Sequence, residues 1–452
     1  MLKRFFVLLL PFLFAGVTFA QFYGFESDQS EMDAGLGMAF IEGESYFAFT
    51  LYPDISIGKV GIGLGVNLLY NTETGKIRST DWDSGYDWAR IIRYIRYGHK
   101  GDAFYTRVGA LDAERLGHGF ILNYYNNQLN YDERKLGLVL DADFGSFGFE
   151  SLTNNLGRTE VLGFRGYYRP LYQSAIPVFK RLAVGGSFVT DRDPDAWTET
   201  DETVSVWGLD VELPLIRSSL LNMVLYADHA KINSYGSGQA IGLMTHFSAL
   251  WDWLALSVNV ERRFLGKEFV GSFYDPFYEM YRYTTYDDLV DYFESLGGSQ
   301  DGIPEDLKAQ TDETQLHLSK HQLLPMITEK QRGWYGALLF DFFHLVKAVG
   351  SYQKIDKLDN SGILHIGAGL SQNVPIFDIE AAYDKRGIEK SKDVFTLDDR
   401  SVARIGIGYK LKPYLLLYMD YIWNFEYNEN MGRYESQKRF QPRIAFRYPF
   451  NL

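Results

Sequence analysis

The feature that most constrains the fold is a two-residue alternation between apolar and non-apolar side chains, repeated along the chain. In residues 254–263, leucine and valine alternate with Ala, Ser, Asn, Glu and Arg, and residues 34–40, 60–66 and 403–411 repeat the pattern. Successive side chains of a β-strand point to opposite faces. Ten residues at about 3.3 Å each, tilted by about 40°, span roughly 25 Å, the height of the apolar band of a membrane barrel. The pattern therefore predicts strands with one lipid-facing and one interior face.

Composition separates a membrane barrel from other architectures that share this alternation. After residue 20 there is no apolar run near 18 residues, so no helical span is predicted. The chain has 32 Tyr, 33 Phe and 43 Gly, which fits two-faced strands with aromatic girdles. A soluble β-sandwich would alternate too, but so many strands in one chain without a linker disfavour it. We predict an all-β, transmembrane, antiparallel up-and-down β-barrel in which residues 21–452 form one domain.

The first twenty residues predict export. Lys3 and Arg4 precede an apolar run over residues 5–14, and Thr18 and Ala20 are small residues at the −3 and −1 positions of a cleavage site before Gln21. This arrangement is typical of a secretory signal peptide. The net charge of −13 argues against a nucleic-acid partner. The absence of cysteine suits a closed barrel, whose strands are each held by two neighbours.

The end of the chain carries a more specific pattern. Ile444, Phe446, Tyr448, Phe450 and Leu452 occupy every second position, and Arg443 and Arg447 lie on the opposite face. This resembles the terminal assembly signal of outer-membrane β-barrel proteins, which usually ends in Phe, whereas this chain ends in Leu452. The resemblance covers the architecture and assigns no named porin or transporter family. It implies a Gram-negative outer membrane location, contact with outer-membrane lipid, and recognition of the last strand by the barrel-assembly machinery.

Connection lengths predict the topology. Short turns near Pro214–Ser218, Ala249–Asp252, Phe343–His344, Gln372–Pro375 and Lys412–Pro413 alternate with longer connections near Lys231–Gly238, Leu265–Arg332, Lys354–Ser361, Arg386–Asp399 and Tyr427–Glu435. Bacterial barrels have short periplasmic turns and longer outer loops. A strand over Phe120–Gln128 would break this alternation, and without it the count is 20 strands, with 18 and 22 as alternatives.

Two segments depart from simple hairpins. Residues 112–134 have an apolar centre, so we expect this loop to fold into the barrel and narrow it, the alternative being another hairpin. The candidate constriction residues are Arg115, His118, Phe120, Asn123 and Tyr124. Residues 265–332 predict a long, partly helical extracellular insertion, with one helix over 287–296 and a second opened by Pro304. This insertion could cap the mouth, bind a partner or cover the rim.

Side chains opposite the apolar faces define the candidate lumen lining: Arg107, Arg165, Glu261, Arg263, Arg404, Lys410, Asp420, Arg443 and Arg447, with Tyr105 and Tyr418. This set is mainly basic. Such residues would bias a water-filled pore toward anions, since charge rings set pore selectivity. The alternative is that arginine–carboxylate ladders fill and rigidify the interior.

Candidate chemistry is sparse. The chain has no G-x-S-x-G, P-loop or H-E-x-x-H motif, and we assign no catalytic residue, metal or cofactor. His317 and His321 would align on a helix, but two isolated histidines are more often surface residues than metal ligands.

The sequence favours a porin-like channel for small polar or anionic solutes. A non-conducting adhesin, receptor or envelope anchor is the alternative, and a barrel enzyme comes third. The oligomeric state stays open.

Overall fold

The computed structural model describes residues 30–83, 85–130, 135–176, 178–195, 202–248, 253–308, 316–371, 373–428 and 433–450. The predicted signal peptide, its cleavage site at Ala20/Gln21, Leu452, the turn at residues 249–252 and positions 131–134 of the expected inward loop lie outside the described residues.

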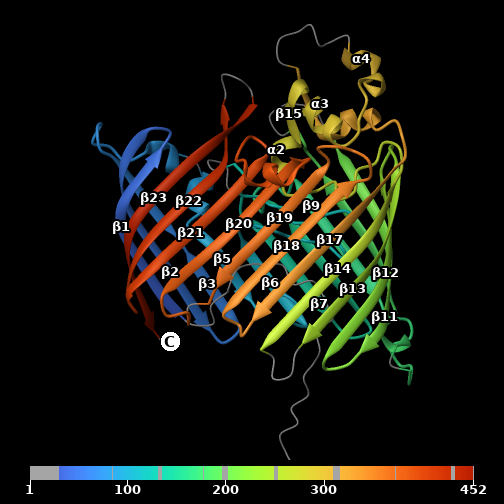
Figure 1. Ribbon diagram of the computed structural model, residues 1–452, viewed down its shortest axis with the longest axis horizontal. Helices are drawn as coiled ribbons and strands as arrows, with labels where there is room; N and C mark the ends of the chain where they lie inside the picture. Colours follow the sequence, from blue (N-terminus) through green and yellow to red (C-terminus); the bar gives the residue numbers. More distant parts are fainter. Residues whose placement is uncertain are drawn as a thin grey trace, which may run out of the picture.

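Twenty antiparallel strands form a closed barrel (Figure 1). The barrel closes because β1 (Ser30–Ile41) pairs with β23 (Arg433–Phe450), with Ser30 opposite Phe450. Segments β3 (Val60–Leu64) and β4 (Val66–Asn71) form one strand interrupted at Gly65, since both pair with β2 (Glu44–Ile57). The other strands are β5 (Ile92–Tyr97), β6 (Phe104–Gly109), β7 (Gly137–Asp143), β8 (Phe147–Thr153), β9 (Val161–Tyr168), β10 (Ala183–Asp191), β11 (Val204–Arg217), β12 (Leu221–Ile232), β13 (Ser237–Ser248), β14 (Leu254–Leu265), β17 (Gln331–Phe342), β18 (Val346–Ile355), β19 (Gly362–Leu370), β20 (Phe377–Ile388), β21 (Ser401–Lys412) and β22 (Leu415–Asn428). The predicted fold class and strand number are confirmed.

The two ends of the barrel differ in their connections. The end that carries Ser30 and Phe450, here the turn end, has tight turns such as 58–59, 343–345 and 413–414. The opposite end, here the loop end, carries residues 72–83, 85–91, 110–130, 135–136, 266–308, 316–330 and 389–400 (Figure 1). One expectation is wrong: the connection near Lys231–Gly238 is only the turn 233–236, because β12 and β13 extend further than their apolar patterns do. Short helices lie in the connections: η1 (Ser79–Asp81), α1 (Gly85–Ala89), η2 (Phe179–Arg181) and η6 (Ser391–Phe395).

The two faces of the wall have opposite character. On β14, Val260 and Phe264 are exposed to the outside, whereas Asn259, Glu261 and Arg263 are buried on the interior face. An apolar outer surface is stable only against lipid, and interior charges must be paired or hydrated. This distribution identifies a transmembrane barrel. Within the described residues, none of the helices has the length and apolar character that a bilayer crossing requires.

The insertion at the loop end is partly helical, as predicted. It contains α2 (Tyr278–Tyr281), β15 (Tyr283–Thr285), α3 (Tyr286–Ser295), η4 (Gln300–Gly302), α4 (Glu305–Lys308), β16 (His317–Ser319) and η5 (Lys320–Met326). The side chain of Thr285 caps α3 by accepting a hydrogen bond from the backbone N–H of Asp288. His317 lies in β16 and His321 in η5, so the expected alignment of these histidines on one helix is wrong.

Candidate functional site

The segment after β6 crosses the interior of the barrel. Its N-terminal part reaches β8, where the backbone N–H of Gly117 donates to Glu150 at 2.8 Å. Its middle stacks the ring of Tyr124 on His365 of β19, with ring centroids 3.9 Å apart. Its far end meets β22, where the backbone N–H of Phe425 donates to the carbonyl of Leu129. The chain turns sharply at Gly117 and Gly119, whose φ angles are 55° and 86°, values that glycine adopts without steric cost.

The five candidate constriction residues lie inside the barrel and are buried: Arg115, His118, Phe120, Asn123 and Tyr124. His118 stacks on Tyr226, and its Nδ1 lies 3.0 Å from the carboxylate of Asp228. Phe120 packs against Phe269 of the insertion, with centroids 5.7 Å apart. These side chains therefore hold the segment in place by packing and pairing, and they face neither lipid nor bulk solvent.

The inward segment and the insertion form one body. The backbone N–H groups of Ser272 and Tyr274 donate to the carbonyls of Phe120 and Ile121, at 2.8 and 3.1 Å. Their apolar side chains share a core, whose members include Leu122, Phe273, Phe277, Phe293 and Leu324. We call residues 111–129, 266–308 and 316–327 together the plug.

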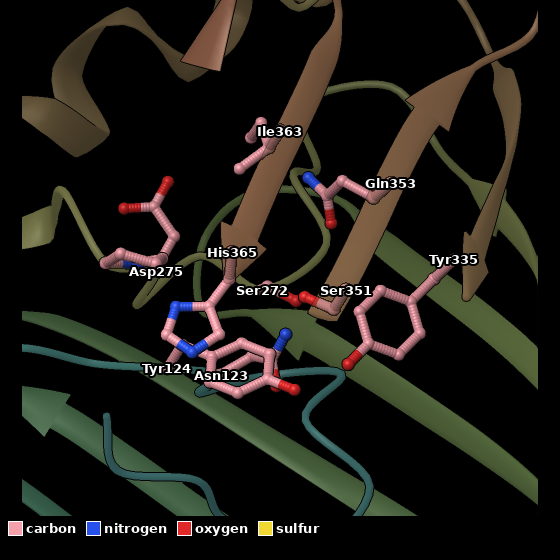
Figure 2. A pocket seen from close by; sticks show the side chains of 10 residues that line it. Asn123, Tyr124, Ser272, Asp275, Tyr335, Ser351, Gln353, Ile363 and His365 are labelled. Carbon is pink, nitrogen blue, oxygen red and sulfur yellow. The ribbon is translucent and has the colours of Figure 1, made fainter. Parts of the chain in front are cut away.

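A small pocket lies where the plug meets β17–β19 (Figure 2). Its lining comprises Asn123, Tyr124, Ser272, Asp275, Pro276, Tyr335, Ser351, Gln353, Ile363 and His365. His365 Nδ1 lies 2.7 Å from Asp384, and His365 Nε2 has no hydrogen-bond partner among the described residues. Ser351, His365 and Asp384 are cross-strand neighbours, but no hydrogen bond joins Ser351 to His365 in the described chain. The contact between nucleophile and base that a hydrolase needs is therefore not formed.

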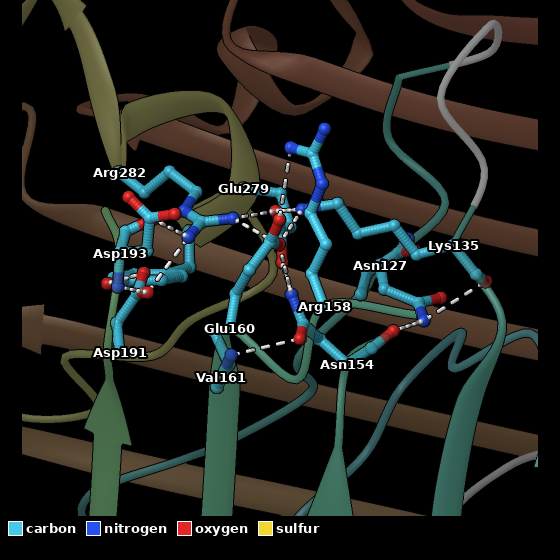
Figure 3. Close-up of polar contacts among 12 residues, drawn as sticks. Asn127, Lys135, Asn154, Arg158, Glu160, Val161, Asp191, Asp193, Glu279 and Arg282 are labelled. Carbon is cyan, nitrogen blue, oxygen red and sulfur yellow. Dashed lines mark hydrogen bonds and ion pairs between the residues drawn. The ribbon is translucent and has the colours of Figure 1, made fainter. Parts of the chain in front are cut away.

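A buried ionic cluster ties the plug to the wall (Figure 3). Arg282, just after α2, bonds Glu160 at 2.9 Å, Asp191 at 2.8 Å and the carbonyl of Asp193 at 2.6 Å. Lys135 Nζ lies 2.8 Å from Glu160 and 2.7 Å from Glu279. Although burial opposes ionisation, Lys135 and Arg282 hold the pKa of Glu279 at about 2. We call Lys135, Glu160, Asp191, Glu279 and Arg282 the anchor cluster.

Part of the interior face stays open to water beside the plug. Glu380 and Ala382 lie on the same face of β20 as buried Asp378, which is the interior face. Arg404 of β21 is the cross-strand partner of Ala382 and therefore also points inward. All three residues are nevertheless exposed. Asp112 on the plug side is also exposed, with 46% of its side chain accessible. Glu380, Asp112 and Asp420 are the charged groups that act most strongly on Arg404. We call Asp112, Glu380, Ala382, Arg404 and Asp420 the lateral path.

Most other candidate lumen residues are paired on the interior face. Arg165 lies 3.0 Å or less from Glu150, Asp210 and Glu212. Arg443 pairs with Asp33 at 2.8 Å and with Asp420 at 3.1 Å.

The remaining candidates follow the same rule, except Lys410. Arg447 pairs with Asp378 at 2.7 Å, Arg107 lies 3.9 Å from Asp112, and Arg263 contacts Glu261. Lys410 instead donates to the carbonyl of Val374.

The expectation of a mainly basic lumen is wrong, because carboxylates stand beside these arginines. The interior acids that the sequence analysis left out include Asp33, Glu150, Asp210, Glu212, Asp228, Asp378, Glu380 and Asp384. The two-residue alternation places each of these acids on the interior face once the inward-facing positions of its strand are identified. Among the described residues, no group of three or more histidines and acids is arranged to hold a metal ion.

Comparisons with known proteins show no close relative. No protein-family model and no curated protein matches the chain. Among solved structures, OprD of Pseudomonas aeruginosa matches with a TM-score of 0.32 at 9% identity, over 94% of this chain and 96% of its own. The siderophore receptor PirA of Acinetobacter baumannii gives 0.35 at 11% identity, over 93% and 81%. CdiB of Acinetobacter baumannii gives 0.26 at 7%, and this chain spans only 60% of its length. At TM-scores of 0.35 and below, these likenesses say nothing about function, and the fold rests on the strand pairing described above.

Proposed function

We propose that the chain is an outer-membrane channel for small polar solutes. The observation that carries this proposal is the lateral path, where Glu380, Ala382 and Arg404 face inward and are nevertheless exposed. On β14, by contrast, inward-facing Asn259 and Glu261 are fully buried. A barrel built only as a rigid support would gain most by packing its interior all round. We infer that water, and therefore a small solute, passes along the lateral path.

The orientation follows from export and assembly. The signal peptide delivers the chain to the periplasm, and the last strand carries the signal for the barrel-assembly machinery. The turn end then faces the periplasm, and the loop end with its insertion faces outward. The proposal does not depend on the oligomeric state.

The charges of the lateral path do not favour anions. One arginine stands among three carboxylates, of which Asp420 is shared with Arg443 and Asp112 with Arg107. The expected anion bias rested on arginines that are paired elsewhere, so we limit the proposal to small polar solutes with, at most, a weak cation preference.

The test is reconstitution of the purified protein into planar lipid bilayers under a salt gradient. We expect discrete conductance steps at low voltage and a reversal potential near zero or displaced toward cations. A protein that inserts, as shown by heat-modifiable migration, but never conducts would overturn the proposal. A strong anion preference would overturn the account of the charges.

A second candidate function is a closed binding barrel, and the plug favours it. The shared core of the inward segment and the insertion fills much of the loop end, as it would in a receptor whose outer surface captures a ligand. This candidate predicts no conductance in the wild type and a large conductance after deletion of residues 272–326. The channel proposal predicts conductance in both proteins.

A further inference from the structure

The outward faces of β12–β14, β17 and β18 carry permanent charge only at the loop end. Their other outward positions hold apolar and aromatic side chains, His229 and a few neutral polar side chains, with no Asp or Glu at any of these described positions. The four permanently charged residues on this face are Lys231, Arg262, Arg332 and Lys354. Each lies within three residues of the loop-end terminus of its strand. A need for solubility would not by itself place charges of a single sign at a single end of a lipid-facing surface.

Three of these cations form a compact group. Arg262, Trp334 and Lys354 are direct cross-strand neighbours on β14, β17 and β18. Arg332 lies opposite Phe264 in the next row toward the loop end. We call Arg262, Phe264, Arg332, Trp334 and Lys354 the rim cluster.

Aromatic rings orient the arginines of the rim cluster. The Arg262 guanidinium lies 4.8 Å from the ring centroid of Trp334 and 5.9 Å from that of Phe264, and Arg332 lies 5.8 Å from Phe264. Stacking of this kind holds a guanidinium flat and leaves its edge free to bond a ligand.

One acid partly balances the rim cluster. Asp356 accepts two hydrogen bonds from Arg262, at 3.0 and 2.5 Å, and its backbone N–H donates to the carbonyl of Arg332. The hydrogen bond from Arg262 holds the pKa of Asp356 below its ordinary value, and Arg332 and Lys357 act in the same direction. Arg262 and Arg332 thus share one carboxylate, and Lys354 adds a third cation, so the rim cluster has an excess of positive charge.

The rim cluster stands at headgroup height. Trp is enriched where the bilayer meets water, so Trp334, which is 53% exposed, marks that level. A lipid-facing cation is costly at the bilayer midplane and nearly free of cost at the interface. At this level the headgroups of the surrounding lipid would come within reach of Arg332 and Lys354.

We propose that the rim cluster binds a phosphate group of a lipid in the leaflet at the loop end. Arg332 and Lys354 supply the charge, and the planar guanidinium groups match phosphate oxygens with paired hydrogen bonds. Arg262, fixed by Asp356 and by Trp334, sets the position of the other two. The inference rests on the outward face alone, so it holds whether or not the barrel conducts.

The test uses the full chain in nanodiscs of phosphatidylcholine containing one-tenth bisphosphorylated lipid A, with retained lipid counted by native mass spectrometry. We expect the wild type to retain lipid A and the double variant R332Q/K354Q to retain at least tenfold less. The matched control K59Q/K412Q removes the same charge at exposed positions of the turn end and should behave as wild type. The charge-preserving variant R332K/K354R should recover most of the binding.

Three results would overturn the proposal. They are equal retention by R332Q/K354Q and wild type, an equal loss in K59Q/K412Q, and equal retention of lipid A from which both phosphates have been removed. Heat-modifiable migration of each variant confirms that the barrel is folded, so a loss of lipid is not a loss of fold. Conductance measured on the same samples tests the channel proposal separately.

Discussion

Removal of the Arg282 side chain should release the plug from the wall. Arg282 bonds Glu160, Asp191 and the carbonyl of Asp193 within 2.9 Å, so Arg282→Gln leaves buried carboxylates with fewer counter-charges. Glu160 keeps Lys135, and Asp191 keeps the hydroxyl of Tyr278 at 2.8 Å. Removing one partner of a buried ion pair costs about 3–5 kcal/mol. At about 1.4 kcal/mol per tenfold change, the undocked population of the insertion should rise by roughly two to three and a half orders of magnitude.

Hydrogen exchange measures this population directly. Amides of α3 exchange when the insertion undocks. Their protection factors should therefore fall in Arg282→Gln by the same two to three and a half orders of magnitude, while the protection factors of the β14 amides should not change. Arg158→Gln is the matched control, because Arg158 is 3.8 Å from Glu160 with 48% of its side chain exposed. A surface pair contributes about 0–1 kcal/mol. Unchanged protection in Arg282→Gln, or an equal effect of Arg158→Gln, would refute the role of the anchor cluster.

Three further outcomes are expected. The pKa of Glu279 is depressed from 4.5 to about 2, so docking of the plug should be fully stabilised above about pH 4.5 and should weaken as the pH falls toward 2. The measurement is hydrogen exchange of the α3 amides, which should become faster over that range. Exchange that is independent of pH after correction for the intrinsic rate would contradict this. Gly242→Val should cost about 1–3 kcal/mol in urea unfolding, because a Cβ there would lie 2.2 Å from the Tyr226 ring, while Gly336→Val, whose Cβ meets nothing closer than 3.7 Å, should not. Arg404→Glu should move the reversal potential toward cations, and no shift would remove this residue from the conducting path.

The architecture could be predicted from the sequence because it depends on a short-range signal. Alternation in residues 254–263 and 403–411 places Glu261 and Arg404 on the interior face regardless of the rest of the chain. The strand count also followed, once the segment around Phe120 was excluded from the wall. The turn at 233–236 was overestimated because Lys231 and Gly238 end the apolar pattern before the strands themselves end.

The interior contacts could not be predicted in the same way. The pairing of Arg165 with Asp210 and Glu212 joins residues 45 and 47 positions apart, and no local pattern encodes it. The anchor cluster joins Arg282 to Glu160 across 122 positions. The shared core of Phe120 and Phe273 depends on how two loops meet in space. The lateral path is the part of the interior that the plug does not fill, so it can be located only from the complete structure.

The most direct test of the channel account uses the absence of cysteine in the chain. A single Ala382→Cys variant places a thiol on the lateral path, and Ala337→Cys places one on the packed interior face of β17, where Ala337 is buried. Both proteins are reconstituted in planar bilayers and treated with a charged, water-soluble methanethiosulfonate reagent. The account predicts that the reagent lowers the conductance of Ala382→Cys and leaves Ala337→Cys unchanged. Conductance that the reagent does not affect in Ala382→Cys, although mass spectrometry shows the thiol modified, would contradict passage along the lateral path.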